Sequence, residues 1–314
     1  GDAEVGGHRR DDRAPSAGLA AARLADLRAH ALQATLRPVT EPLPRIAVLG
    51  AGSMGGALLS GLVASGAPHG GITAVNRTGA KADALGGAGA TSLALERDAD
   101  AARTALRGAG LVVLGVKPVG IPELLRDIRD DLEPDAVVVS IAAGVTIATM
   151  EALVPNPVLR AMPNTPALVR QAVTGLAAGS RVAPAQAAVA RAFFETVGAV
   201  IELPEDRLDA LSAISGSGPA YVFLLIEALT GTARRLGFGE DDARTMVEGT
   251  FRGASELLAA SDVGPAELRR RVTSPKGTTE RAIAVLEEAD LAGLFDRAAA
   301  AAVERAGRLA RGEA

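Results

Sequence analysis

Three glycines at positions 50, 52 and 55 have the spacing of a phosphate-binding turn. They lie between the apolar run 46–49 and a helix-forming stretch that begins by Met54. In such a turn the first glycine permits the tight bend, the second lets the backbone approach a pyrophosphate, and the third lets helix and strand pack closely. The helix N-terminus adds free N–H groups and a positive dipole end. The spacing predicts a dinucleotide site, with expected contacts at Gly50, Gly52, Ser53, Met54 and Gly55.

The residues after the second apolar run, Asn76, Arg77 and Thr78, indicate which dinucleotide binds. NAD-dependent enzymes commonly place an acidic residue here for the ribose 2′-hydroxyl, and this segment has none. The guanidinium of Arg77, between two small hydrogen-bonding side chains, suits a 2′-phosphate through charge-assisted bonds. We therefore expect NADPH as the cofactor. If Arg77 only solvates a turn, NADH could serve as well.

Three further apolar runs end in short segments that combine small residues or proline with polar groups. The carboxyl ends of parallel strands meet at one edge of a doubly wound sheet, where such sheets bind ligands. Ordinary turn chemistry would give a similar composition. Three such ends in register with the glycine turn favour a cofactor crevice. The expected contacts are Val116, Lys117, Pro118, Ala142, Ala143, Gly144 and Asn164.

Two segments in the second half, 215–221 and 272–279, are rich in hydroxyl groups and backbone N–H groups. The second should present its N–H groups at a helix N-terminus, beside Thr278 and Thr279. This geometry suits a small anion such as a carboxylate. A serine or threonine helix cap without a ligand is the alternative, and the spacing alone leaves both open.

Apolar runs alternate with helical stretches between residues 45 and 204. The runs lie at 46–49, 72–75, 111–116, 136–141, 157–161, 173–178 and 198–202. The helical stretches between them lie at 53–65, 79–86, 96–107, 120–130, 146–153 and 184–196. This alternation predicts an α/β fold with a doubly wound, mostly parallel sheet of the Rossmann type, in which some later strands with short connections run antiparallel.

The strand signal disappears between residues 205 and 314, which we expect to form an all-helical domain. The expected helices are 206–236, 240–260, 264–272, 277–288 and 290–311. The stretch 221–233 is nearly all apolar, with Glu227 as its one charge. Such a helix must be buried on nearly all sides, and we expect burial against a second subunit. A helix sandwiched between two domains of one chain is the alternative.

The composition of the 314 residues argues against several other classes. A net charge of −4 without a basic stripe argues against a nucleic-acid or membrane surface. The absence of cysteine excludes disulfides, thiolate catalysis and zinc–thiolate sites. The three histidines lack metal-ligand spacing, and no uninterrupted apolar run reaches the roughly 18–20 residues of a membrane span. We expect a cytoplasmic protein without a metal.

Residues 1–44 differ from the rest, being rich in Ala, Arg and Asp and ending in three prolines. We expect a mobile N-terminal extension, within which residues 18–36 could form a short helix.

Five motifs, in order, resemble the pyrroline-5-carboxylate reductase family. They are the segments 50–55, 116–118, 162–164, 215–221 and 273–279. The last two are the specific ones, because many dehydrogenases share the glycine turn. The match runs from about residue 45 to about residue 311. It implies reduction of 1-pyrroline-5-carboxylate by NAD(P)H, the last step of L-proline synthesis. It also implies a Rossmann domain, an all-helical domain and intertwined homodimers that can assemble further.

The resemblance also implies roles for individual residues. Thr279 would be the catalytic residue that hydrogen-bonds the ring nitrogen, and Asn164 and Ala143 would flank the nicotinamide. Asp262 and Glu227 are further candidates, although an exposed loop acid and a buried, paired carboxylate are the simpler interpretations. The expected substrate contacts are Val272, Ser274, Lys276, Gly277, Thr278 and Thr279.

The chain departs from the family pattern at Lys276, where a glycine is usual, and in its N-terminal extension. If this backbone position needs a positive φ, lysine costs roughly 1 kcal/mol. If it does not, the ammonium could reach the substrate carboxylate or a cofactor phosphate. We expect only that lysine is tolerated here.

Two other functions stay open. One is a different two-domain enzyme, such as an imine reductase or a 3-hydroxy-acid dehydrogenase. The latter normally needs a lysine or another proton-transfer group, which Lys276 could supply. The other is a non-catalytic cofactor-binding regulator, which would keep the three glycines and lack the region around Thr279. Both regions are intact here, which weighs against the regulator.

Overall fold

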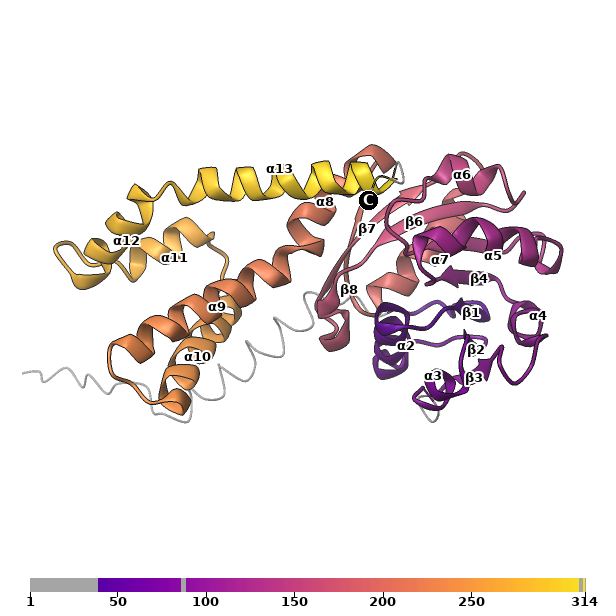
Figure 1. Ribbon diagram of the computed structural model, residues 1–314, viewed down its shortest axis with the longest axis horizontal. Helices are drawn as coiled ribbons and strands as arrows, with labels where there is room; N and C mark the ends of the chain where they lie inside the picture. Colours follow the sequence, from indigo (N-terminus) through magenta and orange to yellow (C-terminus); the bar gives the residue numbers. More distant parts are fainter. Residues whose placement is uncertain (1–38, 86–88, 311–312, 314) are drawn as a thin grey trace, which may run out of the picture.

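The computed structural model describes residues 39–85, 89–310 and 313. Its sheet has eight strands in the order β3-β2-β1-β4-β5-β6-β7-β8 (Figure 1). The strands are β1 (Ile46–Leu49), β2 (Ile72–Asn76), β3 (Thr91–Ala94), β4 (Leu111–Leu114), β5 (Val137–Ser140), β6 (Val158–Met162), β7 (Ala172–Ala178) and β8 (Gly198–Glu202). The doubly wound α/β fold predicted from the sequence is confirmed.

The strands are parallel except at one junction, where β7 runs antiparallel to β6. β8 then pairs parallel to β7. The expectation that some later strands run antiparallel is therefore confirmed. The sequence prediction missed β3, because this edge strand, Thr-Ser-Leu-Ala, is only partly buried and lacks a continuous apolar run.

Helices cover both faces of the sheet, because successive strand residues point to opposite sides. In β1, Ile46 and Val48 pack toward one face, and Ala47 and Leu49 pack toward the other. The first face is covered by α2 (Ser53–Ser65) and α7 (Pro184–Glu195). The second is covered by α4 (Ala101–Leu106), α5 (Ile121–Ile128) and α6 (Ile147–Glu151). The short α3 (Gly79–Asp83) follows β2.

The predicted extension at residues 1–44 falls mostly outside the described residues, as does the helix expected at 18–36. Leu43 is nevertheless part of the sheet domain. Its side chain is buried, and its backbone N–H donates to the Pro68 carbonyl at 2.8 Å. Contacts of the sheet domain therefore begin slightly before residue 45.

The chain after residue 205 is entirely helical in its described part. Its elements are η4 (Glu205–Arg207), α8 (Leu208–Leu211), the π-helical η5 (Ser212–Gly216), α9 (Gly218–Arg235), α10 (Glu240–Ala259), α11 (Pro265–Arg271), α12 (Thr278–Glu288) and α13 (Leu291–Ala310). These bounds agree closely with the expected helices. α9 leads away from the sheet and α13 returns to end beside α8, so the helices form an arm (Figure 1).

The apolar helix α9 is exposed within one chain. Phe223 is 66% exposed and Leu224 is 64% exposed, and Ala233 is its one fully buried residue. The alternative of a helix sandwiched between two domains of one chain is therefore wrong. Glu227 is also exposed, so its interpretation as a buried, paired carboxylate is wrong for the single chain.

The helical stretch Glu205–Arg235 is long and apolar enough to cross a membrane, judged by length and composition alone. The most apolar 18 residues of this stretch have a mean hydropathy of 1.3, and 6% of them are buried. Charged residues interrupt this stretch, so it contains no uninterrupted apolar run of that length. Most of its apolar side chains are not covered by the described part of the chain.

Gly61 marks the closest approach between α2 and the chain that enters β8. A Cβ at this position would overlap the Cγ1 atom of Val197. We expect Gly61→Ala to lower the free energy of unfolding by about 1–3 kcal/mol, because the packed layer must shift. The control is Gly56→Ala in the same helix, where the Cβ would lie 3.5 Å from Leu85 in ordinary contact. Its better helix propensity should raise stability by up to about 1 kcal/mol, and urea unfolding that shows equal effects would contradict this account.

Candidate functional site

The glycine turn has an open backbone of the kind that a pyrophosphate requires. Gly50 has a φ of +91°, and a Cβ there would lie 2.8 Å from the Val116 nitrogen. Its carbonyl accepts a hydrogen bond from the Gly52 N–H at 2.8 Å. A Cβ on Gly52 would meet nothing within 4 Å, so a ligand can approach this backbone. No described side chain caps α2, and its first turn has no acidic residue, so its N–H groups suit a phosphate.

The parallel strands bring the other predicted cofactor segments to the same edge of the sheet. The Gly115 N–H donates to the Leu49 carbonyl at 2.8 Å, which holds the loop with Val116, Lys117 and Pro118 beside the glycine turn. The Ile141 N–H donates to the Leu114 carbonyl at 3.1 Å, which adds the loop of Ala142, Ala143 and Gly144. The cofactor residues predicted after β1, β4 and β5 thus lie together. Their individual contacts with a cofactor stay predictions.

The end of β2 and the turn that follows it contain two polar groups of interest. One is the buried amide of Asn76, and the other is a carboxylate that the sequence analysis did not predict. Asn76 is only 3% exposed, and its Nδ2 atom has no hydrogen-bond partner among the described residues. Arg77 is exposed, and Thr78 precedes α3. The Glu96 carboxylate, from the loop after β3, accepts a hydrogen bond from the Gly79 N–H at 2.7 Å. This acid was missed because it lies far along the chain from Asn76.

Asn164 joins the sheet to the beginning of the helical arm. Its Oδ1 atom accepts from the Val173 N–H and its Nδ2 atom donates to the Ser215 carbonyl, both at 2.9 Å. The residue is 6% exposed. Both ends of its amide are therefore bonded within the chain, and its predicted contact with the nicotinamide stays a prediction.

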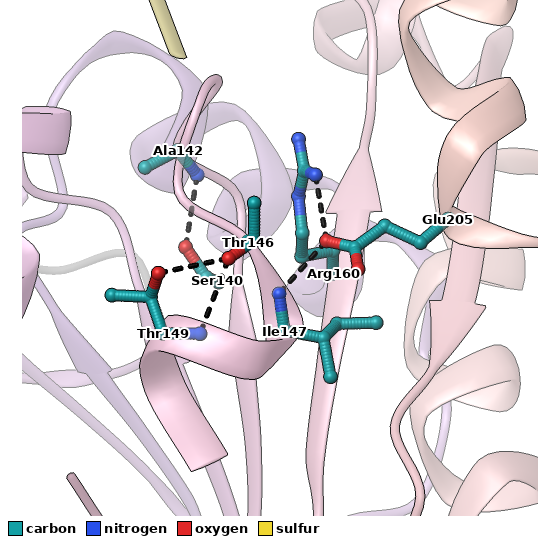
Figure 2. Close-up of polar contacts among 7 residues, drawn as sticks. All are labelled: Ser140, Ala142, Thr146, Ile147, Thr149, Arg160 and Glu205. Carbon is teal, nitrogen blue, oxygen red and sulfur yellow. Dashed lines mark hydrogen bonds and ion pairs between the residues drawn. The ribbon is translucent and has the colours of Figure 1, made fainter. Parts of the chain in front are cut away.

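A partly buried ion pair holds the start of the arm against β6 (Figure 2). The Arg160 Nη1 atom lies 2.8 Å from Glu205 Oε1, and the same oxygen accepts from the Ile147 N–H at 2.8 Å. Glu205 thereby links β6, the N-terminus of α6 and the first residue of the helical region. Sequence reasoning missed this pair, although an arginine within a buried strand is a signal that could have found it.

Two neighbouring bonds fix the loop after β5. The Ala142 N–H donates to Ser140 Oγ at 3.2 Å, and Thr146 caps α6 by accepting from the Thr149 N–H at 3.1 Å (Figure 2). These bonds hold the predicted segment Ala142–Gly144 between two anchored ends.

The hydroxyl-rich segment 215–221 begins in the π-helical turn η5, which interrupts the helix as the sequence indicated, and ends in the first turn of α9. A π-helix leaves carbonyl groups that a regular α-helix would pair internally, and such turns are frequent at functional sites. Side chains pair them here. The Tyr221 hydroxyl donates to the Ala213 carbonyl at 2.9 Å, and the Ser215 hydroxyl donates to the Leu211 carbonyl at 3.1 Å.

The second hydroxyl-rich segment lies at the start of α12. Gly277 precedes the helix, and no described side chain caps its first N–H groups. The side chains of Val272, Ser274, Thr278 and Thr279 are exposed. Asp262 is exposed too, in agreement with its interpretation as a loop acid. The Thr273 hydroxyl donates to the Arg269 carbonyl at 2.7 Å. The hydroxyl groups of Ser274, Thr278 and Thr279 have no hydrogen-bond partner among the described residues, so they remain available to a ligand.

Lys276 has a φ of +60°, so this position does require the left-handed conformation that favours glycine. Its backbone N–H donates to Glu280 Oε2 at 2.9 Å, which stabilises the turn. The ammonium group forms no ion pair with a described residue. Its predicted contact with the substrate stays a prediction.

Nearby arginines on α11 already have carboxylate partners. Hydrogen bonds from Arg270 and Arg271 lower the pKa of Glu267 to about 2. Arg269 lies 2.9 Å from a Glu287 carboxylate oxygen. Lys276 and Arg281 are the cations next to the segment that have no ion pair with a described residue. No group of three His, Asp or Glu residues in the described part of the chain could hold a metal ion.

One chain does not bring the two halves of the predicted site together. The glycine turn lies in the sheet domain, and α12 lies toward the far end of the arm (Figure 1). A reaction that needs both segments therefore needs a second copy of the chain or a large movement of the arm.

The fold and the open glycine turn define a two-domain, dinucleotide-binding oxidoreductase of the Rossmann type. Residues 45–144 match the family model "NADP oxidoreductase coenzyme F420-dependent". Residues 205–309 match the model "Pyrroline-5-carboxylate reductase dimerisation". The pyrroline-5-carboxylate reductase of Pseudomonas aeruginosa is 40% identical over 270 residues, which cover 85% of this chain and 97% of the relative. The chain belongs to the pyrroline-5-carboxylate reductase family.

Solved structures agree with this assignment. A pyrroline-5-carboxylate reductase from Coxiella burnetii has a TM-score of 0.78 and 37% identity, covering 84% of this chain and 98% of its own. The Plasmodium falciparum pyrroline carboxylate reductase, solved with NADP bound, has a TM-score of 0.72 and 25% identity, covering 85% and 98%. The predicted family, fold class and nicotinamide cofactor are confirmed.

We expect Asn164→Ala to lower the free energy of unfolding by about 1–3 kcal/mol, because the Val173 N–H and the Ser215 carbonyl lose their buried partner. Asn164→Asp keeps the acceptor for Val173 and replaces the donor with an oxygen, so it should also destabilise the protein. Denaturant unfolding measures both. Wild-type stability in both variants would contradict the linking role of the amide.

Proposed function

We propose that this chain reduces 1-pyrroline-5-carboxylate to L-proline with NADPH, the last step of proline biosynthesis. The observation with the greatest weight is its identity to named reductases over nearly their whole length. The intact segment 273–279 and the open glycine turn support the same activity. They also weigh against a non-catalytic cofactor-binding regulator.

The residues at the sheet edge fit a nicotinamide dinucleotide. The open backbone of Gly52 and the uncapped start of α2 would hold the pyrophosphate, and Asn76 has a free buried amide nearby. Arg77 is exposed and can approach a 2′-phosphate. Ala143 and Asn164 would border the nicotinamide end. Bound NADPH supplies the hydride.

The chain's own residues would hold the imine in position for that hydride. Ser274 and Thr278, with the N–H groups at the start of α12, would bind the substrate carboxylate. Thr279 would hydrogen-bond the ring nitrogen. A protonated cyclic imine is already a strong hydride acceptor, so correct placement, with reacting atoms about 3–3.5 Å apart, would provide most of the acceleration. Hydroxyl groups and backbone dipoles add electrostatic stabilisation.

The active site would form between two copies of the chain. Cofactor and substrate segments lie far apart in one copy, and the apolar face of α9 is exposed (Figure 1). A homodimer would cover α9 and could place the arm of one copy over the sheet edge of the other, and dimers could assemble further. We therefore assign the apolar stretch Glu205–Arg235 to a subunit interface rather than to a membrane. A cytoplasmic location without nucleic-acid partners is also part of the proposal, and the net charge of −4 without a basic stripe supports it.

Purified protein mixed with NADPH and 1-pyrroline-5-carboxylate tests the proposal. Loss of absorbance of the reduced nicotinamide, with L-proline as product, is the expected result. A 3-hydroxy acid with NADP⁺ and an unrelated cyclic imine with NADPH serve as competing substrates. Turnover of one of those, without turnover of 1-pyrroline-5-carboxylate, would contradict the proposal.

We expect Thr279→Ala to lower kcat/KM for the imine by roughly tenfold to a thousandfold, the equivalent of one to a few kcal/mol of transition-state stabilisation. NADPH binding should be unchanged. Thr250→Ala on α10 removes another arm hydroxyl, one that donates to the Met246 carbonyl, and should have little effect. Full activity of Thr279→Ala would remove this residue from the mechanism.

We expect Lys276→Gly to raise the free energy of unfolding by about 1 kcal/mol, because it relieves a left-handed lysine. Lys276→Ala removes the ammonium and keeps the unfavourable backbone, so it should not stabilise the protein. Thermal unfolding and steady-state kinetics measure both variants. An unchanged substrate KM in both variants would rule out a substrate role for the ammonium, and a large rise shared by both would assign the ammonium to the substrate.

A further inference from the structure

The turn that should hold the adenosine ribose contains a carboxylate fixed by backbone pairing. The Leu95 N–H donates to the Asn76 carbonyl at 2.9 Å, and the Glu96 N–H donates to the Arg77 carbonyl at 3.1 Å. These bonds continue the parallel pairing of β3 with β2 beyond the last strand residues. The side chain of Glu96 then reaches the Gly79 N–H through Oε2 at 2.7 Å. Two backbone hydrogen bonds and one side-chain hydrogen bond therefore hold Glu96 at this turn.

The other charges near this turn largely balance. The Arg97 guanidinium lies over Gly79, where an added Cβ would be 2.6 Å from Nη2. It forms two hydrogen bonds to Asp83, at 2.7 and 2.6 Å, and these bonds lower the pKa of the Asp83 carboxyl. Arg77, Glu96 and the exposed Lys81 have no salt bridge to a described residue. The charge of Arg97 also attracts Glu96, although its hydrogen bonds go to Asp83.

The charges of Arg77 and Glu96 favour different cofactors. A guanidinium attracts the 2′-phosphate that NADPH has and NADH lacks. A carboxylate at the same turn accepts a hydrogen bond from the free 2′-hydroxyl of NADH and repels a phosphate. The Oε1 atom of Glu96 has no partner among the described residues, so it remains available for a hydroxyl. NAD-dependent Rossmann enzymes commonly have this acid at the end of the second strand, and here an acid that follows the third strand lies at the same turn.

We infer that Glu96 determines cofactor specificity by opposing Arg77, so that the chain binds NADPH and NADH with comparable affinity. The inference rests on the proposed function, because it concerns the cofactor of the same site. It predicts that the neutral variant Glu96→Gln prefers NADPH more strongly than the wild type does.

Equilibrium binding of each nucleotide to the full chain, without imine, tests this inference. Isothermal titration calorimetry should show that Glu96→Gln lowers the Kd for NADPH by about three- to tenfold, with an unchanged or slightly higher Kd for NADH. Glu96→Ser is a second neutral variant. Arg77→Ala should raise the Kd for NADPH more than that for NADH. Added salt should reduce the gain in Glu96→Gln, because it screens charges near the surface.

Glu133→Gln is the matched control. Glu133 is also exposed, and its Oε1 atom accepts from a backbone N–H, that of Gly108, at 2.7 Å. This variant loses the same charge and the same type of bond elsewhere on the sheet domain. The ratio of the two Kd values should equal that of the wild type.

Several results would overturn the inference. One is a Kd ratio in Glu96→Gln and Glu96→Ser that equals the ratio in Glu133→Gln. Another is an equal loss of affinity for both nucleotides, which would assign Glu96 to the structure of the turn. If the ratio does not shift while the wild type reduces the imine, only this inference fails. If the ratio shifts as expected and the imine is not reduced, the proposed function fails and the inference stands.

Discussion

The helical arm leaves most of its apolar side chains exposed within one chain, and the proposed dimer and active site both depend on covering them. Phe223 and Leu224 on α9 lie in solvent, although their side chains could each contribute about 1.5–3 kcal/mol if buried. A second copy is the cover that agrees with the dimerisation model matched by residues 205–309. The same arm presents Thr279, so the surface that needs a partner also holds the proposed substrate groups.

The sheet domain contributes the other half of the proposed site, the cofactor edge, because of the direction of its strands. Because β1, β2, β4 and β5 are parallel, their carboxyl ends meet at one edge, where the glycine turn and the loops around Val116 and Ala143 lie together. Asn164 and the Arg160–Glu205 pair then connect this edge to the first turns of the arm. The same few bonds therefore link the edge predicted to hold the cofactor to the start of the arm.

Residue type and spacing within short windows predict most of the helices and strands. The features that they do not predict depend mostly on contacts between residues far apart in the sequence. The glycine turn, the helices of the arm and the break near Ser215 follow from residue type and spacing within short windows. The edge strand β3 has too weak a pattern to be recognised. Glu96 reaches the cofactor turn only because β3 pairs with β2, and Glu205 meets Arg160 from 45 residues away. The exposure of Glu227 similarly depends on the path of the arm rather than on its sequence.

The proposed active site combines the glycine turn of one copy with Thr279 of another. Co-expression of two impaired variants, Gly52→Asp and Thr279→Ala, followed by assay of the reduction of 1-pyrroline-5-carboxylate by NADPH, tests this arrangement. Gly52→Asp alone should be nearly inactive, and Thr279→Ala alone should keep at most about a tenth of the wild-type kcat/KM. Hybrid dimers formed by co-expression would contain one intact site, and activity should return to roughly a quarter of the wild-type value for random pairing. No recovery in confirmed hybrids would contradict the account.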